Sequence, residues 1–307
     1  MGKATTNNLA SVWFVIFLGY IIVLILTSCV SQAEKKTLAE HYIELGNNYM
    51  ELKKYDKAAT AYSRAIELDS ENIGGAYNYA RALIETGKYE EAINLLVKLT
   101  KQDPENTLFL TALAYAYYRA GRNEEAITTY SKVVMLRYND EVSTANLCIL
   151  LEHAGRYEEV VLYYQSLIAI SDAPDMYRLK LGEVYYKLNK IDEARAELDN
   201  YTAAKPDDGA GIKLLVKILE KQGMRDDALA RIESYVLKVQ NDAEALFMFA
   251  RLQFLAGKLQ EGLESLGKAL KAGYNDKKSL AELLELKETA SIGEDIKKLI
   301  EENQPAK

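Results

Sequence analysis

A pattern that recurs every 34 residues limits the fold of this chain more than any other feature of its sequence. Seven consecutive windows align without an insertion or a deletion. The windows are 39–72, 73–106, 107–140, 141–174, 175–208, 209–242 and 243–276. Arrays of this kind bury their apolar faces by stacking each unit on its neighbours. The chain of 307 residues is therefore expected to form one repeat array.

The apolar residues within each window predict two helices. Window positions 4, 7, 8 and 11 are mostly apolar and share one helix face, whereas positions 20, 24 and 27 form the stripe of a second helix. Position 7 holds Leu45, Tyr79, Leu113, Leu147, Leu181, Leu215 and Phe249. Small residues at positions 8 and 20, such as Gly46 and Ala58, are expected to let the two backbones approach closely. Gln253 and Gly262 stand at core positions of the seventh window, which predicts looser packing there.

A tight turn is expected between the two helices. Window position 15 holds Gly87, Gly121, Gly155, Gly223 and Gly257, with Lys53 and Asn189 in the other two windows. Glycine and asparagine tolerate the left-handed conformation that ends many helices. Positions 18 and 19 are mostly acidic, and acidic side chains stabilise the positive end of a helix.

These windows resemble tetratricopeptide repeats. The resemblance covers residues 39–276 and implies an all-α fold, an α-solenoid in which about seven helix-turn-helix repeats form a right-handed superhelix. Residues 277–307 do not continue the repeat and are expected to form a capping pair of helices. The sequence Ser291-Ile292-Gly293-Glu294 has the pattern of a capping box that starts the second of them.

The N-terminus carries an apolar run, residues 12–26, that ends in Leu26-Thr27-Ser28-Cys29. This resembles the bacterial lipobox, which implies a lipoprotein signal peptide over residues 1–28 and a covalent lipid on Cys29. Residues 29–38 would then be the lipidated cysteine and a short tether. An uncleaved membrane anchor and N-myristoylation at Gly2 stay open as alternatives. A buried core helix is disfavoured because the run has no polar face.

The resemblance to bacterial lipoproteins also bears on location. An aspartate after the lipidated cysteine retains many of these proteins at the inner membrane, and Val30 stands there instead. We therefore expect a lipid-anchored protein of the cell envelope, at the periplasmic face of the outer membrane in preference to the inner membrane.

Composition and motifs argue against several classes of function. A net charge of −7 disfavours nucleic-acid binding, and two cysteines and two histidines leave little for a metal centre. We find no catalytic motif and expect no enzyme activity, no metal and no cofactor other than the lipid. His41, Cys148 and His153 are interpreted as structural residues, with Cys148 buried and His153 at a helix end.

The repeat resemblance places a concave groove along the first helix of each pair, at positions 2, 5, 6, 9, 12 and 13. The candidate groove residues are Tyr77, Asn78, Arg81, Tyr115, Tyr118, Arg119, Asn146 and Tyr186, with Phe247, Met248, Arg251 and Phe254 near the far end. A surface with tyrosine beside arginine and asparagine is suited to binding a peptide. The alternative is a solvated helix face. Cations needed to clamp an acidic chaperone tail are missing, since Ile43, Leu108 and Ala112 stand at those positions.

Together these features predict a non-catalytic, membrane-anchored scaffold that binds a protein or peptide partner in the bacterial envelope. It would support the assembly, secretion or transport of an envelope complex. Self-association is a variant of this prediction. The alternative is an accessory lipoprotein of a transport system, with a small hydrophobic or anionic ligand in the groove.

Overall fold

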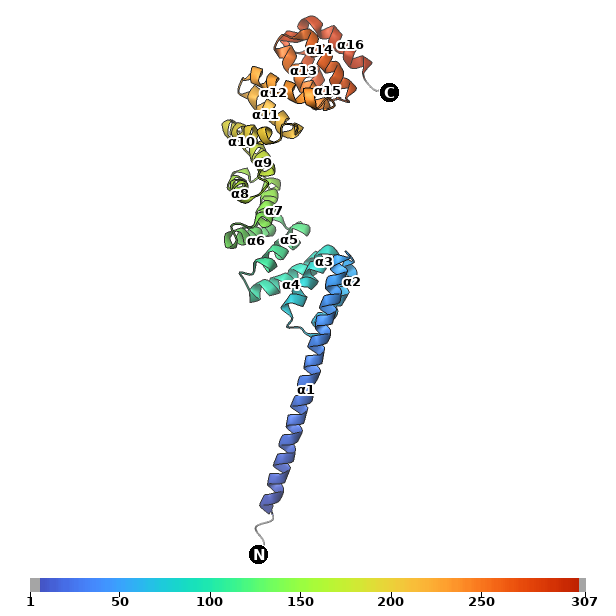
Figure 1. Ribbon diagram of the computed structural model, residues 1–307, viewed down its shortest axis with the longest axis vertical. Coiled ribbons are helices and arrows are strands. Elements are labelled where there is room, and N and C mark those ends of the chain that lie inside the picture. The colour runs from blue at the N-terminus through green and yellow to red at the C-terminus, as the bar shows by residue number, and fades with distance from the viewer. Residues whose placement is uncertain (1–5, 304–307) are drawn as a thin grey trace. The chain divides into compact units, whose positions relative to one another are not determined.

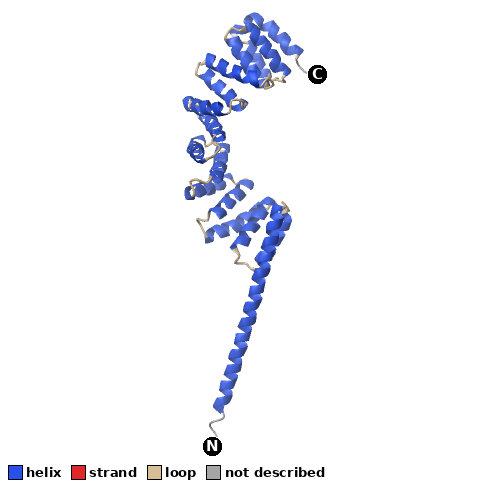
Figure 2. Ribbon diagram, in the orientation of Figure 1, coloured by secondary structure: helices blue, strands red, loops and turns tan. Residues whose placement is uncertain are grey.

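The computed structural model describes residues 6–303, and these residues form helices joined by short loops without any strand (Figure 2). Within residues 6–30 it describes the backbone and the side chains of Phe14, Phe17 and Leu18 alone. The chain divides into two compact units, residues 1–150 and residues 151–307, and each is treated by itself below. The all-α repeat fold expected from the sequence is confirmed.

The helices follow one another in the order that Figure 1 labels. In the first unit they are α1 (Thr6–Glu51), α2 (Tyr55–Leu68), α3 (Ile73–Glu85), α4 (Tyr89–Gln102), α5 (Thr107–Arg119), α6 (Asn123–Leu136) and the start of α7 (Glu141–His153). The second unit continues with α8 (Tyr157–Ile170), α9 (Asp175–Lys187), α10 (Ile191–Ala204), α11 (Gly209–Lys221), α12 (Arg225–Lys238), α13 (Ala243–Leu255) and α14 (Leu259–Lys271). It ends with α15 (Lys277–Leu284), a 3₁₀ turn η1 (Lys287–Ile292) and α16 (Gly293–Glu302).

The turn expected at window position 15 is confirmed in every repeat. All seven residues have a positive φ: Lys53 (55°), Gly87 (80°), Gly121 (77°), Gly155 (70°), Asn189 (58°), Gly223 (76°) and Gly257 (74°). In the second repeat the N–H of Gly87 donates to the carbonyl of Ile84, and the N–H of Lys88 donates to the carbonyl of Leu83. These two bonds are those of a Schellman motif, which closes the first helix of the pair.

Lys53 provides a test of this turn, because a side chain is strained at its φ of 55°. We expect Lys53→Gly to raise the free energy of unfolding by about 0.5–1 kcal/mol, since glycine removes that strain but gains freedom in the unfolded chain. Urea denaturation followed by circular dichroism measures this change. The reciprocal variant Gly87→Lys, in the same turn of the next repeat, should lower stability. Equal stability of Lys53→Gly and wild type would contradict the prediction.

From the second helix pair onwards, the first helix of all pairs but one follows a capping residue that the sequence interpretation did not single out. Window position 34 holds Asn72, Asn106, Asp140, Pro174, Asp208, Asp242 and Asp276. Each asparagine or aspartate in this set accepts a hydrogen bond from a backbone N–H in the first turn that follows, as Asn72 does from Gly75. Apart from Pro174, which makes no side-chain cap, position 34 therefore caps the helix that follows it.

Close packing at the small-residue positions is confirmed. A Cβ atom added at Gly46 would lie 2.5 Å from the ring of Tyr62, and Ala58 is fully buried. The expectation of looser packing at Gly262 is wrong, because the ring of Phe254 lies against this glycine and a Cβ atom there would be 2.5 Å away. Gln253 is 7% exposed, and its Oε1 has no hydrogen-bond partner among the described residues.

The first helix departs from the repeat pattern in two ways. Leu45 is 40% exposed, although residues at the same position in later repeats, such as Leu147, are buried. The reason is that α1 packs mainly against α2 and α3, and among the described residues these helices leave this face open. In addition, residues 29–38, the expected lipidated cysteine and tether, lie within α1 and are helical. They contain no glycine or proline, and most of them favour helix.

The lipobox residues and most of the apolar run before them lie outside the residues whose side chains are described, so the expectation of a lipid on Cys29 is untested. Among the residues that the structure does describe, no helix is both long enough and apolar enough to cross a membrane.

The C-terminal segment forms helices as expected, but the prediction of a capping box at Ser291 is wrong. Helix α16 begins after Ile292 with no side-chain cap, because η1 occupies the residues before it. The buried hydroxyl of Thr289 donates to the carbonyl of Leu283 and ties η1 to the end of α15. Ile296 is fully buried and holds α16 in place.

Candidate functional site

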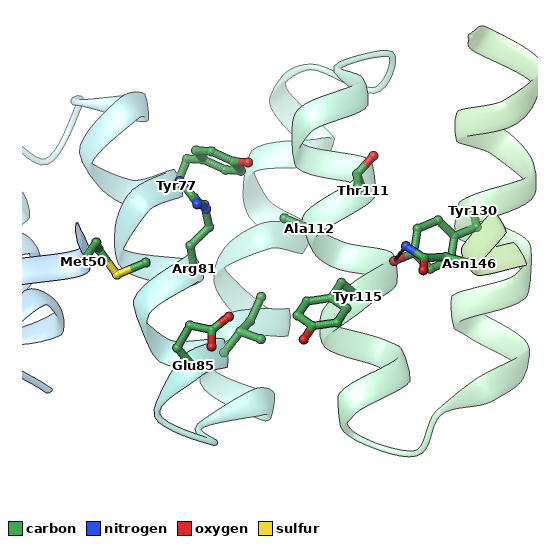
Figure 3. Close-up of a pocket in the computed structure, with 10 residues that line it drawn as sticks. Met50, Tyr77, Arg81, Glu85, Thr111, Ala112, Tyr115, Tyr130 and Asn146 are labelled. Atoms are coloured by element: carbon green, nitrogen blue, oxygen red, sulfur yellow. Dashed lines mark hydrogen bonds between the residues drawn. The ribbon is translucent and has the colours of Figure 1, made fainter. Parts of the chain in front are cut away.

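A hollow of about 270 Å³ lies on the first unit, between side chains of five helices (Figure 3). Tyr77, Arg81, Ile84 and Glu85 come from α3, and Thr111, Ala112 and Tyr115 come from α5; Met50 of α1, Tyr130 of α6 and Asn146 of α7 complete the lining. Ala112 contributes only a short side chain to the lining, from the same helix as Tyr115. Tyr77 packs on Phe109, with ring centroids 5.6 Å apart, so its ring is held at the side of the hollow.

A second hollow of about 530 Å³ adjoins the first and shares Met50, Arg81 and Glu85 with it. Its other lining residues are Asn47, Glu51, Tyr55 and Tyr62. The shared residues make the two hollows neighbours within the first unit, and we call the two together the unit 1 groove.

Amide and hydroxyl groups form a fixed polar set along the unit 1 groove. Asn47 Oδ1 accepts hydrogen bonds from the hydroxyl of Tyr62 at 2.7 Å and from Nδ2 of Asn78 at 3.2 Å. Farther along, Nδ2 of Asn146 donates to the hydroxyl of Tyr130 at 3.3 Å. Burial raises the pKa of Tyr130, so this hydroxyl keeps its proton and can donate to a ligand.

The guanidinium of Arg119 is bound by neighbouring tyrosines. Its guanidinium donates to the hydroxyls of Tyr115 and Tyr89, both at 2.8 Å, and lies 5.6 Å and 5.2 Å from the centroids of the same two rings. The bond to Tyr115 is the main cause that raises the pKa of Arg119. Arg119 therefore positions Tyr115, which lines the hollow, and does not line it itself. Tyr118 is 39% exposed and lies beside Tyr115, with ring centroids 6.5 Å apart.

The eight candidate residues from the sequence thus fall into three sets. Tyr77, Arg81, Tyr115 and Asn146 line the first hollow together. Asn78, Tyr118 and Arg119 lie next to lining residues. Tyr186 belongs to the second unit, where Nζ of Lys221 lies 5.3 Å from the centroid of its ring.

Sequence reasoning did not single out six other lining residues of the first hollow: Met50, Ile84, Glu85, Thr111, Ala112 and Tyr130. Met50, Glu85, Thr111 and Ala112 stand at window positions 12, 13, 5 and 6, which the repeat resemblance assigns to the groove, so position alone could have identified them. Tyr130 stands at position 24, in the second helix, and was interpreted as core.

The corresponding helices of the second unit carry ion pairs between neighbouring repeats. Lys213 Nζ of α11 lies 3.1 Å from Asp242 and 2.9 Å from Glu244, and Lys217 lies 3.3 Å from Glu244. Arg251 of α13 pairs with Glu220 of α11. Burial opposes the charge on Lys213, but its hydrogen bonds to Glu244 and Asp242 outweigh burial and raise its pKa. These cations are neutralised within the chain and are poorly suited to hold a ligand.

The far-end candidates of the second unit are mostly core residues, so their assignment to a groove is wrong. Phe247, Met248 and Phe254 are 4%, 6% and 0% exposed. Tyr274, which follows α14, stacks on Phe247 with ring centroids 4.2 Å apart. The chain just after α14 therefore covers part of this helix face with the ring of Tyr274.

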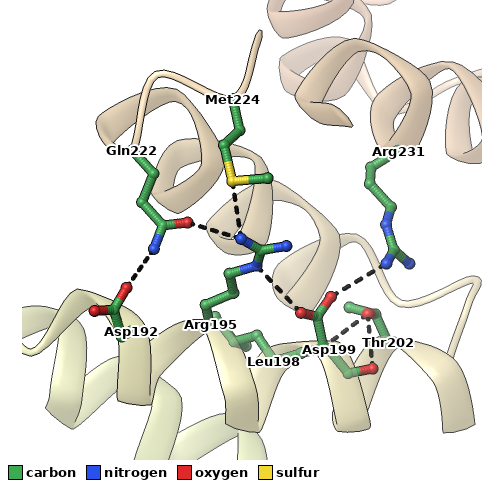
Figure 4. A network of polar contacts seen from close by, with 8 residues as sticks. All are labelled: Asp192, Arg195, Leu198, Asp199, Thr202, Gln222, Met224 and Arg231. Atoms are coloured by element: carbon green, nitrogen blue, oxygen red, sulfur yellow. Dashed lines mark hydrogen bonds and ion pairs between the residues drawn. The ribbon is translucent and has the colours of Figure 1, made fainter. Parts of the chain in front are cut away.

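Elsewhere in the second unit, a polar network ties neighbouring repeats together (Figure 4). Arg195 of α10 contacts Asp199 on its own helix and the side chains of Gln222 and Met224 after α11. Asp199 also pairs with Arg231 of α12 at 3.1 Å. Arg195 thus connects α10 with the turn that follows α11, which indicates a structural role.

His153 and Cys148 have the places expected of them. His153 stands in the last turn of α7, and Cys148 is fully buried. His41 is exposed on α1.

Family models match both units of the chain. One describes the tetratricopeptide repeat domain of cytochrome c-type biogenesis protein H and matches residues 33–142. The other describes the tetratricopeptide repeat and matches residues 151–219. The chain contains tandem tetratricopeptide repeats. No curated protein matches it.

Solved structures of tetratricopeptide repeat proteins share this fold. One from Parabacteroides merdae is 16% identical, covers 87% of this chain and 99% of its own, and superposes with a TM-score of 0.52. The protein YrrB, described as having an unusual peptide-binding site, is 17% identical, covers 61% of this chain and 96% of its own, and gives a TM-score of 0.51. At these identities the likeness shows the fold alone.

Proposed function

We propose that this chain is a non-catalytic scaffold that holds a peptide segment of a partner protein in the unit 1 groove. The observation that carries the proposal is the groove itself, where Tyr77, Tyr115 and Asn146 converge with Arg81. No ion-pair partner of Arg81 is present among the described residues. Rigid tyrosine rings beside amide groups suit the apolar side chains and the backbone of a peptide. The peptide-binding site described for YrrB, which has the same fold, supports this proposal.

The double variant Tyr77→Ala/Arg81→Ala tests the groove. We expect it to reduce capture of the partner at least about tenfold, because it removes an aromatic wall and the guanidinium that lies 5.8 Å from the centroid of that ring. The measurement is cross-linking of the full chain in native membranes, with the partner quantified by mass spectrometry.

The matched control is Arg137→Ala/Tyr138→Ala, which removes an exposed arginine and tyrosine of the same unit outside the groove. Capture by this control should equal that of wild type, and both variants should keep the helical content of wild type. Undiminished capture by Tyr77→Ala/Arg81→Ala would refute the proposal.

We further propose that the scaffold is a lipoprotein of the bacterial cell envelope, anchored through Cys29 at the periplasmic face of the outer membrane. Its task would be the assembly, secretion or transport of an envelope complex. The lipobox-like sequence before Cys29 supports the anchor. The match to a repeat domain named for cytochrome c-type biogenesis supports a task in assembly.

Cys29→Ala is the test of the anchor. Metabolic labelling with a fatty acid should mark the wild-type chain and leave the variant unlabelled, because the thiol that accepts the lipid is gone. Cys148→Ala, which removes the buried cysteine, is the control and should stay labelled. A Cys29→Ala chain that still carries the label would rule out lipidation at this residue.

A further inference from the structure

We propose that the second hollow of the unit 1 groove receives a basic side chain, a lysine or arginine of the bound peptide. The first hollow then receives a large apolar or aromatic side chain of the same peptide. This inference rests on the proposed function, because it names the chemistry of the segment that the groove would hold.

The negative charge of the second hollow comes from Glu51 and Glu85. No described residue forms an ion pair with either carboxylate, and both side chains are exposed. Glu51 is the last residue of α1, and Glu85 is the last residue of α3. The C-terminal ends of helices carry partial negative charge, so the two helix ends add to the attraction for a cation.

The charge of the lining itself comes from few residues. Lys53, Lys54 and Lys88 follow α1 and α3, and none of them lines it. Arg81 is the one cation among the described lining residues of either hollow. Two carboxylates against one guanidinium leave a net charge of −1 in the lining.

Aromatic rings give the second hollow a further means of holding a cation. Tyr55 and Tyr62 both line it, and the hydroxyl of Tyr62 is fixed by its bond to Asn47. A lysine or arginine can bury its aliphatic stem against such rings while its charged end meets the carboxylates. An acidic side chain would meet the same two carboxylates and be repelled.

The first hollow has a different character. Met50, Ile84 and Ala112 provide apolar surface, and the rings of Tyr77 and Tyr115 stand beside them (Figure 3). Since the two hollows share Met50, Arg81 and Glu85, one extended segment can fill both. Side chains two residues apart in an extended chain point to the same side. The expected motif is therefore a basic residue and a large apolar residue separated by one position.

Selection from a random heptapeptide library displayed on phage, against the full-length chain, tests this motif. We expect enriched peptides to carry lysine or arginine two positions from a large apolar or aromatic residue. A synthetic copy of the most enriched peptide should bind Glu51→Gln/Glu85→Gln about tenfold more weakly than wild type. Its affinity for wild type should also fall more steeply with salt than its affinity for the variant.

The matched control is Glu71→Gln, which changes the charge of an exposed glutamate of the same unit outside both hollows and should leave affinity unchanged. Circular dichroism verifies that every variant is folded. Enrichment of acidic peptides, or full affinity of Glu51→Gln/Glu85→Gln for the enriched peptide, would overturn this inference and leave the proposed function standing. Failure to enrich any peptide would overturn both.

Discussion

Gly211→Ala is expected to destabilise the second unit by about 1–3 kcal/mol, the usual effect of forcing an extra methyl group into a packed core. A Cβ atom at this position would lie 2.5 Å from Cε1 of Tyr201. The ring cannot retreat easily, because the hydroxyl of Tyr201 donates to Asp208 at 2.6 Å. Asp208 in turn accepts from the N–H of Ala210 and caps α11. Urea denaturation of the full chain gives the change in unfolding free energy.

Gly74→Ala is the control for this experiment, because Gly74 also lies in the first turn of a helix. The nearest atom to a Cβ there is Oδ1 of Asn72, at an ordinary contact distance of 3.6 Å. Alanine should therefore stabilise α3 by about 0.4–1 kcal/mol, through the smaller entropy of the unfolded chain. If the two variants changed stability equally and in the same direction, the clash with Tyr201 would not be the cause.

Leu215→Ala is expected to lower the unfolding free energy by about 2–5 kcal/mol, since a fully buried leucine leaves a cavity when it is truncated. The effect should be local, because α11 packs mainly against its sequence neighbours α10 and α12. Hydrogen exchange measured peptide by peptide should show faster exchange in α10 to α12 and unchanged exchange in α3 and α4.

Leu237→Ala serves as the comparison, because Leu237 lies on α12 of the same unit and is 70% exposed. Its loss should change stability by less than about 0.5 kcal/mol. Faster exchange throughout the chain in Leu215→Ala would show that the repeats unfold as one cooperative block, contrary to the prediction.

Periodicity predicted the repeating parts of this fold because the same short-range rules apply in every window. Gly87 and its equivalents could be assigned from their spacing, since a helix that ends in a left-handed residue needs only local contacts. The regular caps at position 34 were equally readable but were not singled out, whereas Ser291 was assigned a capping role that η1 prevents.

The errors lie where segments that do not repeat meet the array. Phe247 and Met248 occupy groove positions by their register, yet they are buried in a repeat followed by the C-terminal segment, where Tyr274 stacks on Phe247. Leu45 occupies a core position, yet it is exposed because the described helices that pack on α1, mainly α2 and α3, leave this face open. Register determines which way a side chain points from its helix, and only the neighbouring elements determine whether that face is covered.

For the candidate site too, the sequence predicted the helix face on which a residue lies but not the side chains that it contacts. Tyr77, Arg81, Tyr115 and Asn146 could be placed on one face from their window positions. The sequence could not show that Arg119 is held by Tyr89 and Tyr115, because long side chains reach across repeats in several ways. It also gave no sign that Lys213 is neutralised by Asp242 and Glu244, whereas Arg81 lies over the ring of Tyr77 and has no carboxylate partner among the described residues.

The turn at window position 15 also sets how a gene for this chain can change in length. Adding or removing 34 residues inserts or deletes one complete helix pair, so every later turn and cap keeps its place. Adding a single residue inside a helix rotates all that follows it in that helix by about 100°, which turns its apolar face away from its neighbours. Duplication and loss of whole repeats are therefore the tolerated route for such a gene to lengthen or shorten, and one-residue insertions are tolerated only in the loops between helices.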